Sequence, residues 1–99
     1  MPGGPVRVRW TRKALANLDA EAAYIAQDNP QAARAMVERI QEAVSLLSDH
    51  PALGRPGRVP GTRELVVSDT PYILPYRVRG IVVEILRVLH TARKWPKRF

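Results

Sequence analysis

Hydrophobic positions in the first fifty residues change from an alternating to a helical pattern. Valine and arginine alternate in residues 5–10, which predicts a short strand with one covered face. Two helix-like segments follow, separated by Asn29-Pro30. Their apolar positions are Ala14, Leu15, Leu18, Ala22, Ile25 and Ala26, then Ala33, Met36, Val37, Ile40, Val44 and Leu47. We expect Thr11 to cap the first helix and the second to end before Pro51, giving antiparallel neighbours.

The second half of the chain predicts three strands after a loop rich in glycine, proline and arginine, "GRPGRVPG". The strands span residues 63–67, 72–78 and 81–89, with turns at 68–71 and at Arg79-Gly80. The last run is almost entirely β-branched or aliphatic, which is typical of a central strand buried on both faces. Pro75 interrupts the middle run and predicts an irregularity or a sheet edge there.

The order β-α-α-β-β-β predicts an α+β fold, in which a helical hairpin covers one face of a small antiparallel sheet. Residues 1–99 form a single domain in this interpretation. In the middle strand, alternate side chains point to opposite faces of the sheet. The more apolar set should face the helices, and Arg77 should point to the open side. The apolar set is Tyr72, Leu74, Tyr76 and Val78.

The turn after the middle strand leaves two registers open. A two-residue loop pairs Arg77 with Val82 and brings Glu84 and His90 to the face of Arg77. A three-residue loop with a bulge pairs Arg77 with Ile81 and brings Arg87 there instead.

Charge changes the picture, because the formal net charge of +7 lies wholly in the second half. Up to residue 50, six basic residues balance six acidic ones. Beyond it there are ten basic residues and only three acidic ones, Glu64, Asp69 and Glu84. Thirteen of the sixteen basic residues are arginine, whose planar fork grips phosphate or carboxylate, so a polyanion or an acidic protein is the expected partner. A basic surface that only keeps the chain in solution is the alternative.

Other classes of function are disfavoured by what the sequence lacks. There is no cysteine, so disulfides and thiolate metal sites are excluded, and a zinc site on the two histidines would need carboxylates. We expect no metal and no cofactor. No apolar run reaches membrane-spanning length, and residues 1–10 lack a hydrophobic signal region, which favours a cytoplasmic protein.

The candidate chemistry is RNA cleavage in a shallow basic groove lined by Arg63, Arg77 and either Arg87 or His90. Arginines stabilise the crowded phosphate, and a histidine transfers protons near neutral pH. Candidate RNA-binding residues are Arg55, Arg58 and Arg63. As alternatives, His90 caps a strand end through one hydrogen bond, and Arg87 pairs with a carboxylate such as Glu64. We expect Trp95 and Phe99 to anchor the tail or contact a protein partner.

Four segments together resemble the RelE/ParE superfamily of toxins from bacterial type II toxin–antitoxin modules. They are "NPQAARAMVERI", "HPALGRPGRVPGTRELVV", "PYILPYRV" and "VEILRVLHTARKWP". The resemblance implies the β-α-α-β-β-β order over about residues 6–96. It also implies a cognate antitoxin whose acidic C-terminal segment wraps the toxin, while operator DNA is contacted only through the antitoxin.

The resemblance leaves three activities open. RelE-like members cleave mRNA in the ribosomal A site, ParE-like members inhibit DNA gyrase, and a degenerate member would only bind its antitoxin. Arg63, Arg77, Arg87 and His90 occupy places comparable to RelE-type site residues, and the clustered arginines favour the nuclease. The catalytic lysines and terminal tyrosine of the best-known RelE type are missing, since no lysine lies between Lys13 and Lys94 and no tyrosine follows Tyr76.

Overall fold

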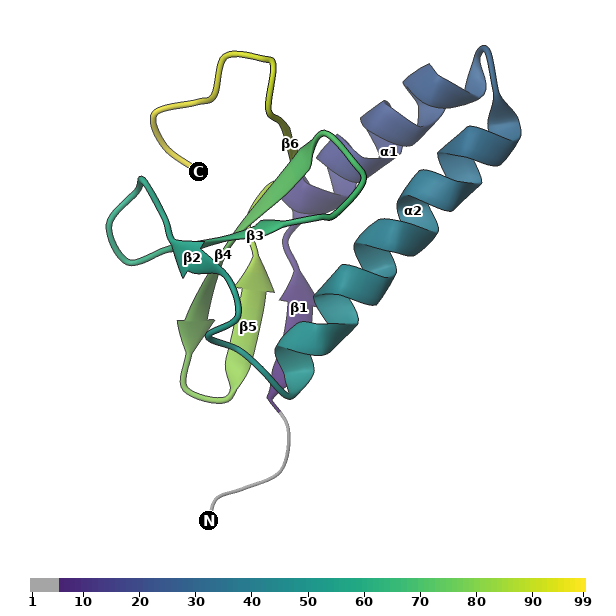
Figure 1. Ribbon diagram of the computed structural model, residues 1–99. Coiled ribbons are helices and arrows are strands. Elements are labelled where there is room, and N and C mark those ends of the chain that lie inside the picture. Colours follow the sequence, from purple (N-terminus) through teal and green to yellow (C-terminus); the bar gives the residue numbers. More distant parts are fainter. Residues whose placement is uncertain (1–5) are drawn as a thin grey trace.

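The computed structural model describes residues 6–99, in which two helices cover one face of a six-stranded mixed sheet (Figure 1). The elements are β1 (Arg7–Trp10), α1 (Arg12–Ala26), α2 (Pro30–Ser45), the 3₁₀ turn η1 (Leu46–Ser48), β2 (Arg55–Pro56), β3 (Arg63–Val66), β4 (Tyr72–Arg79), β5 (Val82–Ile85) and β6 (Leu89–His90). The α+β class is confirmed. Pro5, where the first strand was expected to begin, lies outside the described residues. Residues 1–4, which belong to the segment expected to lack a hydrophobic signal region, also lie outside them.

Both helices begin where the sequence predicts. The Thr11 hydroxyl oxygen accepts the Ala14 N–H at 3.2 Å, and the Asn29 side chain accepts the Ala32 N–H at 3.0 Å. Each contact satisfies a backbone donor that has no partner within its helix, and a cap of this kind contributes about 1 kcal/mol. The antiparallel hairpin is confirmed (Figure 1). None of the helices among residues 6–99 is long and apolar enough to cross a membrane.

The sheet has the strand order β1-β5-β4-β3-β2, and β6 extends it by pairing with β4. The expected antiparallel arrangement holds for every pair except β1 and β5, which run parallel. This correction follows from topology, because the chain returns to pair with β1 only after the whole helical hairpin and three further strands. The central position predicted for β5 is confirmed.

The predicted third strand over residues 81–89 is broken into β5 and β6, with residues 86–88 between them. The break lies beside Pro75, as the sequence suggested. The Leu86 N–H still donates to the Pro75 carbonyl at 2.8 Å, but proline has no backbone N–H and cannot donate a hydrogen bond to the neighbouring strand. The ladder therefore shifts: β4 and β5 pair Tyr76 with Ile85, whereas β4 and β6 pair Tyr72 with His90. That shift moves the side chains after residue 86 to the other face.

The hairpin between β4 and β5 adopts neither of the two expected registers. Its loop is Gly80-Ile81, with φ of +56° at Gly80, and Arg77 pairs with Glu84. Glu84 therefore shares the face of Arg77, as the two-residue alternative required. His90 does not, because of the shift beside Pro75.

The helix-facing side of the sheet forms the core. Tyr72, Leu74 and Tyr76 are buried there, as predicted, together with Val83 and Ile85 of β5. The fourth residue predicted for this face, Val78 at the end of β4, is exposed. The Tyr76 hydroxyl donates to the Pro51 carbonyl and accepts the Gly54 N–H, both at 2.8 Å. This buried side chain thus holds the start of the glycine- and proline-rich loop against the sheet.

Candidate functional site

The residues expected to form one basic groove do not converge. Arg63 pairs with Tyr76 and so belongs to the helix-facing side, whereas Arg77 belongs to the open face. Both line a hollow of about 310 Å³ at the start of β3. Their guanidinium groups nevertheless have different partners: Arg63 Nη1 donates to the Gly54 carbonyl at 2.8 Å, and Arg77 Nε donates to Glu84 at 2.6 Å.

Arg87 lies on the helix side, at the break between β5 and β6. Its Nε donates to the Asn17 side-chain oxygen at 2.8 Å, and the same oxygen accepts the Val88 N–H at 3.2 Å. The alternative role considered for Arg87, pairing with a carboxylate such as Glu64, is therefore wrong. The Asn17 side-chain oxygen on α1 instead accepts hydrogen bonds from both the Arg87 guanidinium and the backbone at the point where the strand is interrupted.

His90 packs against Tyr72, with ring centroids 5.5 Å apart in an edge-to-face arrangement. Its Nδ1 accepts the Ala92 N–H at 3.1 Å, which is the strand-capping role given as the alternative to catalysis. The Tyr72 hydroxyl donates to Glu21 at 2.8 Å, and Arg93 pairs with the same carboxylate. Burial and the Glu21 carboxylate raise the pKa of Tyr72 to about 12.

Arg55 and Arg58, expected to bind RNA, flank a buried carboxylate on the open face. Glu64 is 2% exposed and accepts from the Arg55 guanidinium at 3.1 Å and from the Arg58 N–H at 2.9 Å. Burial opposes ionisation of Glu64, but these donors outweigh it and hold its pKa below the ordinary value. The other side of the Arg58 guanidinium lies 3.7 Å from the ring centroid of Trp95.

The tail is thereby fixed to the body of the protein. The Trp95 indole N–H donates to the His90 carbonyl at 3.1 Å, and Lys13 Nζ donates to the Phe99 carbonyl at 3.2 Å. The expectation that Trp95 anchors the tail is confirmed.

Sequence reasoning missed the part played by two buried carboxylates. Glu64 and Glu84 each pair with more than one arginine on the open face: Glu64 with Arg55 and Arg58, and Glu84 with Arg9 and Arg77. A signal was present, because each is a lone acidic residue among apolar strand positions in a strongly basic half. Within residues 6–99 no three His, Asp or Glu side chains gather as metal ligands.

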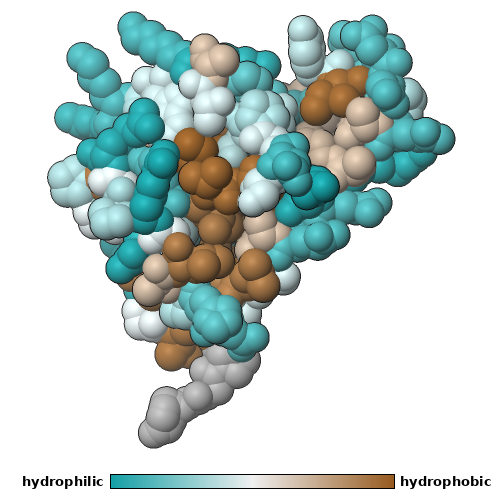
Figure 2. Space-filling view, viewed as in Figure 1, coloured by the Kyte–Doolittle hydropathy of each residue, from teal (hydrophilic) through white to brown (hydrophobic). Residues whose placement is uncertain are grey.

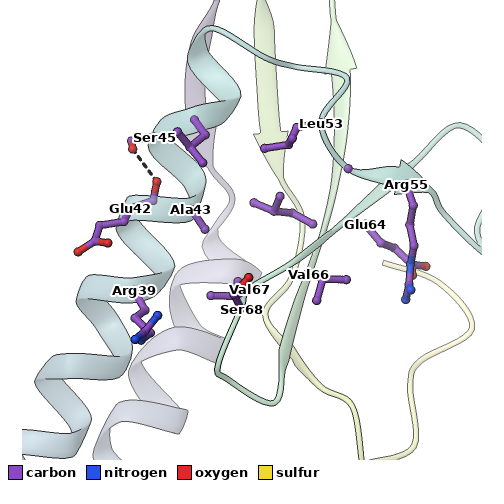
Figure 3. A pocket seen from close by; sticks show the side chains of 13 residues that line it. Arg39, Glu42, Ala43, Ser45, Leu53, Arg55, Glu64, Val66, Val67 and Ser68 are labelled. Carbon is purple, nitrogen blue, oxygen red and sulfur yellow. Dashed lines mark hydrogen bonds and ion pairs between the residues drawn. The ribbon is translucent and has the colours of Figure 1, made fainter.

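A separate feature is an apolar groove between α2 and the edge of β3, with a volume of about 710 Å³. Figure 2 shows it as a hydrophobic stripe that runs between the sheet and the helix. Its exposed apolar members come from η1, the loop that follows it and β3: Leu46 is 53% exposed, Leu53 51% and Val66 51%. In the close-up, Arg39 lies on α2 at one side of the groove and Arg55 beyond β3 at the other (Figure 3). An exposed apolar stripe between charged margins marks a protein-binding surface.

The groove also exposes the backbone of an edge strand. β2 pairs with β3 only at Arg63 and Glu64. The Val67 N–H points the other way, to the Tyr72 carbonyl at 3.2 Å, so alternation directs the N–H and C=O of Val66 into the groove. Such an edge accepts an added strand from a partner.

Comparison with known proteins agrees with this architecture. A family model described as the ParE toxin of the type II toxin–antitoxin system parDE matches residues 8–95. The toxin Y4kP of Sinorhizobium fredii is 53% identical over 91 residues, covering 92% of this chain and 94% of that protein. Toxin RelE2 of Caulobacter vibrioides is 41% identical over 87 residues, covering 88% and 97%.

Two solved structures share the fold. The chromosomal ParDE system of P. aeruginosa contains a chain with a TM-score of 0.77 and 38% identity, covering 86% of this chain and 95% of that one. The RelBE2 toxin–antitoxin complex of Mycobacterium tuberculosis matches with a TM-score of 0.60 and 31% identity, covering 93% and 98%. The chain thus belongs to the RelE/ParE superfamily and is a toxin of the type II toxin–antitoxin class.

Proposed function

We propose that this toxin arrests growth by binding DNA gyrase, without cleavage chemistry of its own. The observation that supports this is the dispersal of the groups that RNA cleavage requires. A proton-transfer group and a cation must reach the same phosphate. Here His90 packs on Tyr72 near the helices, whereas Arg77 is bound to Glu84 on the open face.

Ribosome-dependent mRNA cleavage is the second candidate. The excess of positive charge in the second half and the exposed guanidinium groups of Arg55 and Arg58 favour it. In this proposal Arg63, Arg77, Arg87 and His90 act at the scissile phosphate once the ribosome is bound, and Arg55, Arg58 and Arg63 hold the RNA.

Two assays on the same purified toxin separate these candidates. One follows supercoiling of relaxed plasmid by gyrase, and the other maps mRNA 3′ ends in a reconstituted translation reaction. Gyrase inhibition with intact mRNA supports the first proposal. New ends inside the A-site codon would establish the nuclease and exclude the first proposal, provided that they are lost in Arg77→Ala or His90→Ala. The Arg34→Ala control on α2 should keep these ends. Inactivity in both assays, with no growth defect on induction, indicates a member that only binds its antitoxin.

For the antitoxin, we propose that an acidic segment adds a strand to β3 and inserts apolar side chains into the groove beside α2. The support is the exposed backbone of Val66, the apolar lining and the net charge of +7. A segment of this kind orders on binding, with backbone hydrogen bonds supplying affinity and the apolar contacts supplying specificity.

The groove proposal is tested by co-purification with the antitoxin encoded beside the toxin. Leu46→Asp or Leu53→Asp should weaken the complex at least tenfold, because each places a carboxylate in the apolar lining. Ile81→Asp is the matched control, since Ile81 is 69% exposed at the β4–β5 turn, outside the groove. Equal affinity for all three variants would refute the assignment.

A further inference from the structure

The open face of the sheet carries an arginine cluster that shares only Arg77 with the expected site. Across β1, β5 and β4, one row of neighbouring residues is Arg9, Glu84 and Arg77, and the next is Arg7, Val82 and Arg79. In both rows the partners lie side by side and share a face. The side chains of Arg7, Arg9, Arg77 and Arg79, here called the arginine quartet, therefore project from one surface.

Three members of the quartet are held in place by a single carboxylate beneath them. Glu84 is 5% exposed and pairs with Arg9, with Arg77 at 2.6 Å and with Arg79 at 4.0 Å. The guanidinium groups remain accessible above it, since the Arg9 side chain is 61% exposed and that of Arg79 is 68% exposed. Four cations with one anion leave a surplus of about three positive charges on this surface.

We propose that the arginine quartet binds the sugar–phosphate backbone of duplex DNA. Arginine forks pair with phosphate oxygens through two hydrogen bonds, and positions fixed by strands and by Glu84 lose little freedom on binding. This goes beyond the expectation that DNA is contacted only through the antitoxin, and it does not depend on the target proposed above.

The surroundings of the quartet favour a duplex over a single strand. Proteins that bind single strands provide aromatic side chains on which bases stack. Here Val82 lies between Arg7 and Arg79, Ile81 lies in the adjoining turn, and one face of the Trp95 ring is covered by Arg58. A surface that offers guanidinium groups and no stacking platform fits a ligand that presents only phosphates.

The test is a titration of a fluorescein-labelled 20-base-pair duplex of arbitrary sequence with the purified full chain, followed by anisotropy at several salt concentrations. Arg7→Gln/Arg79→Gln should weaken binding about tenfold and reduce the slope of log K against log salt by about two, because each phosphate contact contributes about one unit. Arg12→Gln/Arg34→Gln has the same net charge but changes exposed arginines on the helices, and should change affinity less than twofold.

Three results overturn the proposal: no duplex binding by the unmodified chain, equal losses in the two double variants, or tighter binding of single-stranded RNA of equal length. A fourth such result would come from competition with poly-glutamate. If poly-glutamate displaces the duplex when both are added at the same concentration of negative charge, the surface binds any polyanion and not the duplex in particular. If the double variant unfolds in a thermal melt, the single variants Arg7→Gln and Arg79→Gln replace it, each with an expected slope change of about one.

Discussion

Arg58 stacks on Trp95, with the guanidinium carbon 3.7 Å from the ring centroid, and so joins the loop before β3 to the C-terminal tail. The contact is partly exposed, since the Arg58 side chain is 57% exposed. A cation–π pair at such a site is worth about 0.5–1 kcal/mol.

A double-mutant cycle measures that contact. Arg58→Ala, Trp95→Ala and their combination are compared by urea unfolding, and we expect a coupling free energy of about 0.5–1 kcal/mol. Arg58→Lys should retain part of it, because the cation remains but the planar stacking is lost. Strict additivity of the two single losses would show that the ring and the guanidinium do not stabilise each other.

Glu64 makes stability depend on pH in the acid range. Because its pKa is lowered on folding from 4.5, its contribution is complete above that value and is lost as the pH falls through the lower folded pKa. Glu64→Gln should reduce the free energy of unfolding by about 1–3 kcal/mol at pH 7, and the difference from the unmodified chain should shrink below pH 4.5. The exposed Glu42→Gln on α2 is the control. A difference that stays constant from pH 7 to pH 3 would contradict the assignment.

Tyr72 makes stability depend on pH in the alkaline range, where its contribution is lost as the pH rises. Its pKa is raised to about 12 from 10.0, so its contribution is present below pH 10.0 and is lost as the pH rises through about 12. Tyr72→Phe should cost about 1–2 kcal/mol at pH 7, since the hydrogen bond to the Glu21 carboxylate disappears. In a spectrophotometric titration the variant should lack the tyrosinate transition near pH 12. Tyr24→Phe, at an exposed helix position, should keep it.

Gly54 has no room for a side chain. A Cβ there would lie 2.6 Å from Tyr76 Cε1 and 2.9 Å from the Glu64 carbonyl oxygen. Gly54→Ala should therefore destabilise the chain by about 2 kcal/mol or more, because Tyr76 is fixed in the core. Gly61→Ala separates this clash from backbone strain: its φ is +82° with nothing near the added methyl, and the expected cost is about 1 kcal/mol. Thermal melts of both variants check the order.

Local patterns were enough to predict the helices, the main strands and the helix-facing side of β4. Thr11 and Asn29 cap helices through contacts three residues away, and Tyr72, Leu74 and Tyr76 alternate within one strand. These features depend on neighbours in the sequence, which periodicity records directly. The family likewise followed from short segments of the chain.

The grouping of the arginines was decided only by the tertiary structure. Which side chains meet across a sheet depends on register, and one added residue reverses every face beyond it. Here the break beside Pro75 separates His90 from Arg77, and the parallel pairing of β1 with β5 brings Arg9 to Glu84. The sequence alone determined which residues carry charge and where the elements lie. Long-range pairing determined which charges share a surface, because it joins residues as far apart as Arg9 and Glu84.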